Sequence, residues 1–302
     1  MSKRIILLGL TNILVVATIL VLASAFGVNR YLHAYGINYG QLAVFCLVWG
    51  MGGAFISLAL SKFMAKTMMG VQVIDPDQAG PEERWLVNTV HRIAQKAGME
   101  RMPEVGIYQS PEVNAFATGP SKNNALVAVS SGILQRMDHD QLEGVLGHEL
   151  SHVGNGDMVT LTLIQGVVNA FVIFLAKVLA LILSNMGRRD DREERASYGM
   201  GTYMLEQALY MVFSLLGMLV VMAFSRWREF RADLGGAQKV GKYKMIGALK
   251  ALKSTLEIRD PAMAKPAMQA FKISGGRRMS LFASHPSLDE RIERLEQASV
   301  IQ

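Results

Sequence analysis

Four long apolar blocks dominate the pattern of hydrophobic and polar positions along the chain. They cover residues 4–28, 38–61, 159–184 and 203–225. A helix needs about 20 predominantly apolar residues to cross the ~30 Å of hydrocarbon in a bilayer, and each block has about that length. We therefore predict an integral membrane protein with about four transmembrane helices.

The block at residues 4–28 also has features of a secretory signal. It includes the basic start Lys3–Arg4 and the small residues ASA at 23–25, a sequence that a signal peptidase can cleave. Its apolar stretch is longer than the core of a usual signal, and the block at 38–61 follows closely. We interpret it as an uncleaved membrane anchor, with a cleaved signal as the alternative.

Two polar segments, at residues 62–158 and 226–302, lie outside the apolar blocks. The first mixes a helical period with short stretches typical of strands, and the second is mainly helical. We predict an α+β fold, mainly α, with helices at 81–98, from 138–140 to about 154, at 242–258 and at 286–297, and with strands at 104–110, 114–119 and 124–134.

Blocks and polar segments together predict four parts: an N-terminal transmembrane pair (1–61), the first part of a soluble domain (62–158), a transmembrane hairpin (159–225) and the second part of that domain (226–302). With four crossings, both polar parts lie on one side of the membrane. That side is cytoplasmic by the positive-inside rule, because it carries Lys3, Arg4, Lys62, Lys66, Arg226, Arg228 and Arg231. The arginine-rich loop at 185–202 opposes this topology, which places it outside.

Composition and charge narrow the classes of partner. Hydrophobic residues make up 51% of the chain and charged residues 19%, which suits a membrane protein better than a simple soluble domain. The net charge of +6 is explained by lysines and arginines that flank the spans and face anionic lipid. Since no basic patch is interleaved with aromatic residues, we expect a lipid bilayer and no nucleic acid. Composition predicts no oligomeric state.

The sequence GHELSH at residues 147–152 has the spacing of a zinc protease site. His148 and His152 are four apart, so a helix places both imidazoles on one face, where they can bind one Zn²⁺ ion. Glu149 lies about 100° around the helix from His148 and can take a proton from a water on the metal as that water attacks a peptide carbonyl. Chance also produces this spacing, so a third ligand is needed.

Glu229 is the candidate for that third ligand. It follows the block at 203–225 by a few residues, and His152 precedes the block at 159–184 by a few. Because these two blocks form a hairpin, both positions emerge on the same face of the membrane. Asp233, four residues after Glu229, can reach the outer nitrogen of a liganding histidine and fix its orientation. The competing interpretation is a solvated, charged helix face.

GHELSH, the EFRAD sequence at 229–233, the four spans and the length all resemble the HtpX family of membrane-bound heat-shock zinc metalloproteases. The resemblance covers the whole chain. It implies a gluzincin-type endopeptidase of the bacterial inner membrane, with one zinc per chain and its active site facing the cytoplasm. It also implies stress-response surveillance of misfolded or damaged membrane proteins. By position, the ligands are His148, His152 and Glu229, and the base is Glu149.

Four further residues are weaker candidates. His285 and Arg291 can stabilise the oxyanion of the reaction, a role that the resemblance favours, or they can belong to a helix start and a surface ion pair. Asn114 and Ala115 begin a predicted strand whose exposed edge can pair with an extended, unfolded polypeptide substrate. An ordinary core strand is the alternative. His33, His91 and His139 lack partners at metal spacing and are predicted to be structural.

Lys177 lies well inside an apolar block, where a charge is costly unless it pairs or reaches the interface. Glu206 begins the next block, so we predict a contact between the two, with separate snorkelling as the alternative.

Two other functions stay open on the sequence alone. A zinc scaffold without proteolysis keeps the metal but has no use for Glu149. A transporter or channel is disfavoured, because ionisable residues within the apolar blocks are too few to line a path.

Overall fold

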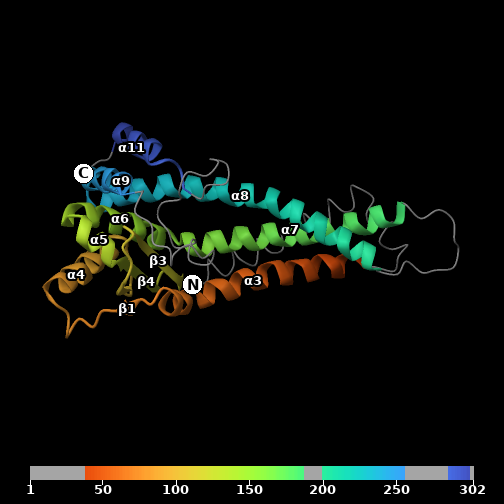
Figure 1. Ribbon diagram of the computed structural model, residues 1–302, viewed down its shortest axis with the longest axis horizontal. Coiled ribbons are helices and arrows are strands. Elements are labelled where there is room, and N and C mark those ends of the chain that lie inside the picture. The colour runs from red at the N-terminus through yellow and green to blue at the C-terminus, as the bar shows by residue number, and fades with distance from the viewer. Residues whose placement is uncertain (1–37, 187–198, 256–284, 300–302) are drawn as a thin grey trace. The chain divides into compact units, whose positions relative to one another are not determined.

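The computed structural model describes residues 38–186, 199–255 and 285–299 (Figure 1). These residues divide into two compact units, one with residues 38–56, 161–186 and 199–221 and the other with residues 57–160, 222–255 and 285–299. The divisions fall inside three long helices, α3 (Tyr39–Met68), α7 (Asp157–Met186) and α8 (Met200–Val240). The first predicted span, at 4–28, lies outside the described residues.

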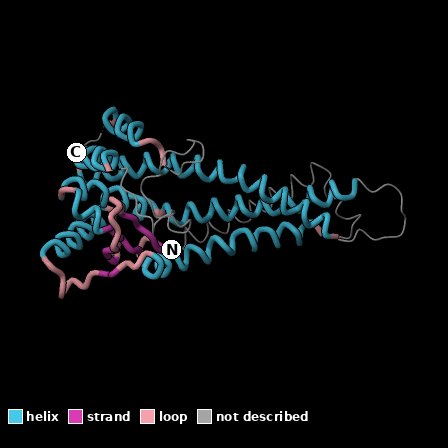
Figure 2. Tube along the Cα trace, in the orientation of Figure 1, coloured by secondary structure: helices cyan, strands magenta, loops and turns pink. Residues whose placement is uncertain are grey.

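The second, third and fourth predicted spans are confirmed as apolar helices long enough to cross a membrane. The candidate stretches are Gly40–Met68, Asp157–Ser184 and Met200–Val240. Within the first unit these helices approach closely: a Cβ added at Gly50 of α3 would lie 2.7 Å from the Cα of Ala170 in α7. α8 is one unbroken helix that continues beyond residue 225 (Figure 2).

The predicted contact between Lys177 and Glu206 is confirmed. The Lys177 Nζ donates to Glu206 Oε1 at 2.7 Å, which joins α7 to α8 inside the first unit. Glu206 is 7% exposed, so the pairing supplies a cation to a carboxylate that lies among apolar side chains.

The second unit contains a four-stranded sheet in the order β1-β2-β4-β3. Its strands are β1 (Gln72–Val73), β2 (Glu104–Tyr108), β3 (Ala115–Ser121) and β4 (Asn124–Ser130). β2 runs parallel to β4, and the other pairs are antiparallel. β3 therefore lies at an edge of the sheet, as predicted for the strand that begins near residue 114.

The strand predicted at 124–134 ends earlier than expected. β4 stops at Ser130, and the short helix α5 (Ser131–Arg136) begins directly after it. The Ser130 hydroxyl accepts a hydrogen bond from the backbone N–H of Ile133, which is the geometry of a helix N-cap. The apolar residues at 133–134 therefore continue a helix and not the strand.

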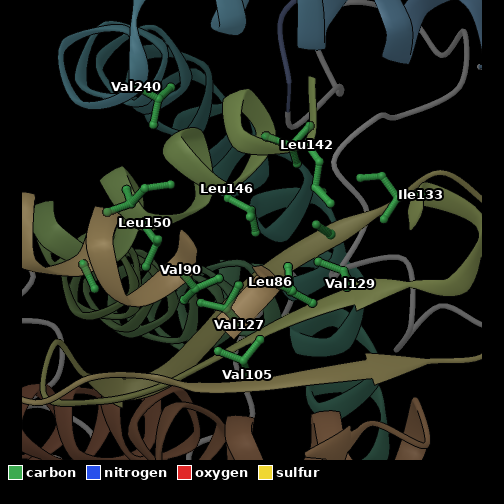
Figure 3. Close-up of a cluster of buried hydrophobic side chains, with 14 of the residues drawn as sticks. Leu86, Val90, Val105, Val127, Val129, Ile133, Leu142, Leu146, Leu150 and Val240 are labelled. Carbon is green, nitrogen blue, oxygen red and sulfur yellow. The ribbon is translucent and has the colours of Figure 1, made fainter. Parts of the chain in front are cut away.

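One face of the sheet packs against α4 (Pro81–Lys96) and α6 (His139–Asn155) (Figure 1). Figure 3 shows the buried side chains between them, among them Leu86, Val127 and Leu146. On the other face, Ala65 in the last turn of α3 and Met69 just after that helix join a cluster with Tyr108 and Phe116, among others. This packing against the sheet and α4 thus fixes the position of α6.

Among the described residues, the second unit also contains the helices α9 (Lys242–Ser254) and α11 (Leu288–Gln297). They share a buried cluster that includes Met245, Leu249 and Leu295. α11 starts at Leu288, later than the predicted residue 286, because the Ser287 hydroxyl caps it by accepting from the N–H of Glu290. The helix predicted at 242–258 ends earlier than expected, at Ser254, with Thr255 as its C-cap.

Candidate metal centre

α6 places two histidines side by side near its C-terminal end. The helix begins at the Asp138 capping box and ends at Gly156, whose φ of 71° is a left-handed conformation that favours glycine. His148 and His152 lie one turn apart, and their Nε2 atoms are 3.2 Å from each other. The rings are perpendicular to each other, and the short distance between the Nε2 atoms shows that both inner nitrogens point to one place.

Glu229 of α8 reaches the same place. Its two carboxylate oxygens lie 3.3 Å from the Nε2 atoms of His148 and His152. Glu229 is completely buried, and its polar position follows the apolar block that ends at residue 225. The ligand atoms of the three residues all lie within 4.8 Å of one another. The structure therefore brings together the three predicted ligands.

The outer nitrogen of each histidine is held by its own aspartate. His148 Nδ1 lies 2.8 Å from Asp233 Oδ1, as predicted, and His152 Nδ1 lies 2.7 Å from Asp157 Oδ2. Sequence reasoning missed Asp157. The signal was present in the sequence GNGD at 154–157, where a left-handed glycine turns the chain so that the next residue faces back to the helix end.

This donor set fits a divalent metal ion. When each Nδ1–H donates to an aspartate, each Nε2 keeps a lone pair that points at the Glu229 carboxylate. Both Glu229 oxygens are buried without a hydrogen-bond partner among the described residues, although imidazole nitrogens surround them. Two imidazoles and a carboxylate are a ligand set that catalytic zinc uses.

The carboxylates around His148 and His152 also change the pKa values of these two histidines. Burial and the neighbouring Arg291 lower the pKa of His148, but the Asp233 and Glu229 carboxylates beside it outweigh them and raise this pKa to about 9. The pKa of His152 is also raised, because Asp157 and Glu229 outweigh burial. A metal ion must therefore displace protons from this pair.

Arg291 of α11 lies behind the site. Its Nε and Nη2 donate to both oxygens of Asp233, at 2.8 and 2.6 Å, and the side chain is 1% exposed. Its Nη1 lies 3.5 Å from Glu229 Oε2. The predicted role was oxyanion stabilisation, but the structure turns this guanidinium toward Asp233, the residue that orients His148.

His285 lies beside the carboxylate of Glu229. Its Nδ1 is 2.8 Å from Glu229 Oε2, and its side chain is 21% exposed, more than those of His148, His152 or Glu229. His285 is thus beside the predicted metal position and accessible from solvent. His91 and His139 lie elsewhere, bonded to the Pro103 carbonyl and to Glu82. His33 is outside the described residues.

Glu149 connects the site to the edge strand. Its Oε2 accepts a hydrogen bond from the backbone N–H of Ala117 in β3 at 3.0 Å. Ala115, predicted to bind substrate, begins the same strand. Asn114 directly precedes it, and its side-chain amide donates to the Tyr108 hydroxyl at 2.8 Å within the sheet. β3 and the metal-binding helix are therefore direct neighbours.

Sequence comparison identifies proteins that are similar to this chain. The model of Peptidase family M48 matches residues 81–299. The chain is 53% identical over 303 residues to "Protease HtpX homolog" of Bacillus subtilis (strain 168), covering 98% of this chain and 99% of that relative. It is 53% identical over 296 residues to "Protease HtpX" of Shewanella loihica, covering 97% and 99%.

The fold is also similar to a solved structure. The crystal structure of S. mikatae Ste24p matches with a TM-score of 0.58 at 15% sequence identity, covering 96% of this chain and 67% of that one. At this identity the likeness concerns the fold alone.

Proposed function

The chain belongs to peptidase family M48, and within it to the HtpX proteases, and from this we propose that it is a zinc-dependent endopeptidase of the bacterial inner membrane. The observation that carries the proposal is the convergence of His148, His152 and Glu229, with Glu149 on the next position of the same helix. The family is one of metallopeptidases, and the apolar helices make the chain a membrane protein.

His148, His152 and Glu229 would hold one Zn²⁺ per chain. When bound, such an ion polarises a peptide carbonyl and lowers the pKa of water to about 7. Asp233 and Asp157 fix the two imidazoles so that their inner lone pairs face the ion. Arg291 holds Asp233 from behind, and we assign it a positioning role.

Glu149 is the general base. Its carboxylate takes the proton of the attacking water, and returns it to the amine that leaves when the C–N bond breaks. His285, beside Glu229 and partly exposed, is placed to donate to the oxygen that gains negative charge. Glu149 and His285 keep their predicted roles in this proposal, and the positioning role of Arg291 replaces the predicted one.

We propose extended, unfolded segments of misfolded or damaged membrane proteins as substrates, in a stress-response role. The support is the edge position of β3, which can pair with any extended backbone through main-chain hydrogen bonds. Four crossings, with the span at 4–28 as the first, and the flanking lysines and arginines favour a catalytic unit that faces the cytoplasm.

The proposal is tested by Glu149→Gln in the full-length, zinc-loaded protein. We expect casein cleavage to fall by at least about a hundredfold while the zinc content per chain stays at the wild-type value. Glu143→Gln is a matched control, because Glu143 lies on the same helix, is 6% exposed and pairs with Lys244 and Arg92 away from the metal residues. Wild-type cleavage by Glu149→Gln would refute the role of Glu149.

A further inference from the structure

The contact between Glu149 and Ala117 occupies a group that substrate binding requires. In an antiparallel pair, residues alternate between those whose N–H and C=O face the partner strand and those whose groups face away. The Ser130 N–H donates to the Asn114 carbonyl, so position 114 faces β4. Ala117 is three positions further along, an odd number, so its N–H and C=O face away from β4, toward the free edge.

The hydrogen bond between Ala117 and Glu149 agrees with this alternation along β3. Ala117 is opposite Val127 in the register, and its N–H donates to Glu149 and not to β4. An extended peptide that adds to the edge of β3 needs outward donors and acceptors on this strand, of which the Ala117 N–H is one. A backbone N–H has a single hydrogen, so it cannot serve both Glu149 and a substrate carbonyl at full strength.

We propose that the Ala117 N–H is a specificity-determining group, which the substrate backbone takes from Glu149 when it pairs with β3. Docking of an extended chain then frees the Glu149 carboxylate to turn toward the reacting water. This inference rests on the proposed function, in which Glu149 is the general base. It adds the condition that the base becomes fully available only after a substrate strand has formed.

The physical consequence is selection for extended backbone. A peptide long enough to place a carbonyl opposite Ala117 replaces one hydrogen bond by another and releases the base. A substrate that is too short, or is held in a helix, leaves the carboxylate on Ala117. The discrimination acts on backbone conformation, so it needs no side-chain motif in the substrate.

The test measures peptide binding to metal-free, full-length protein, where no cleavage occurs. A fluorescein-labelled, unstructured peptide of about ten residues, long enough to span β3, is titrated in excess chelator and followed by anisotropy. Glu149→Ala removes the competing carboxylate, so the Kd is expected to fall by about tenfold, the scale of one hydrogen bond to a charged group. Glu149→Asp keeps the charge but shortens the side chain by one methylene, and it is expected to tighten binding similarly. Glu143→Gln should leave the Kd unchanged.

Two results would overturn the proposal. An unchanged Kd for Glu149→Ala would show that Ala117 and Glu149 do not compete with the peptide. Tighter binding for Glu149→Ala but a wild-type Kd for Glu149→Asp would assign the effect to charge repulsion. Because cleavage plays no part in these titrations, this failure is separate from failure of the proposed function, which is read from cleavage by zinc-loaded Glu149→Gln.

Ala117→Pro provides a second check through a double-mutant cycle. Proline removes the N–H at a position where it faces the free edge, which is where strands accept proline. In this background Glu149→Ala is expected to change the Kd by less than about twofold, because the shared donor is gone. A full tenfold gain from Glu149→Ala in the proline background would contradict the role of the Ala117 N–H.

Discussion

Replacing Asp233 by asparagine tests how the residues behind the metal ligands support the site. Asp233 is 2% exposed and holds two partners, His148 Nδ1 at 2.8 Å and the Arg291 guanidinium at 2.6 and 2.8 Å. The asparagine amide would still offer an oxygen to one partner, but the substitution would remove the negative charge that pairs with Arg291. Two separate losses are therefore expected, one in metal affinity and one in stability.

The magnitudes follow from burial. Breaking a buried ion pair by removing one partner costs about 3–5 kcal/mol, because the other charge is left uncompensated. Loss of the residue that orients a liganding histidine lowers metal affinity by about 10- to 100-fold. Asp157→Asn is the matched control: Asp157 orients His152 in the same way, at 2.7 Å, but within the described part of the chain it forms no ion pair with an arginine.

The assay is thermal unfolding of the full-length protein in detergent with excess chelator, combined with zinc competition against a chelator of known affinity. Both variants are expected to lose about 10- to 100-fold in zinc affinity. Only Asp233→Asn should be strongly destabilised, by about 3–5 kcal/mol. Adding Arg291→Met should restore part of that loss, because it removes the unpaired charge. Equal unfolding of Asp233→Asn and Asp157→Asn without metal would refute the reasoning.

Three further outcomes are expected. The pKa of metal-free His148 is raised to about 9, so zinc must displace its proton below that pH. Titrations should show the zinc affinity falling about tenfold for each unit by which the pH decreases, per proton displaced. A zinc affinity that stays constant from about pH 6 to about pH 8 would contradict this. Lys177→Met should destabilise the protein more than Lys177→Met combined with Glu206→Gln, because the single change leaves a buried carboxylate unpaired. Additive losses of stability in thermal unfolding would show that the two residues are not coupled. Gly144→Ala should cost about 1–3 kcal/mol, because its Cβ would lie 2.7 Å from that of Ala248 in α9, and unchanged unfolding would show that the helices separate freely.

Local geometry explains why much of the site was predictable. The spacing of His148 and His152 fixes their common face through the helical period alone, and Asp138 marks the start of that helix. Glu229 was found because a hairpin of two apolar blocks returns the chain to the same side. The edge position of β3 was also expected, although the order β1-β2-β4-β3 depends on pairings between distant residues.

Contacts that depend on packing direction were harder to predict. Asp157 reaches His152 only because Gly156 adopts a left-handed conformation, which composition suggests but does not specify. Arg291 turns toward Asp233 because α11 packs on α9 through Ile292 and Leu295, and no local pattern sets that orientation. The end of β4 at Ser130 was predictable in principle, since a serine before an apolar helix start is a capping signal.

Zinc K-edge X-ray absorption of the loaded, full-length protein tests most directly whether His148, His152 and Glu229 form one metal centre. The predicted result is one zinc per chain with two imidazole nitrogens at about 2.0–2.1 Å and a carboxylate oxygen at about 2.0–2.2 Å. Glu229→Ala should remove that oxygen and leave both imidazoles. Zinc whose coordination is the same in the wild-type protein and in Glu229→Ala, or that lacks two imidazole ligands, would contradict the proposed centre.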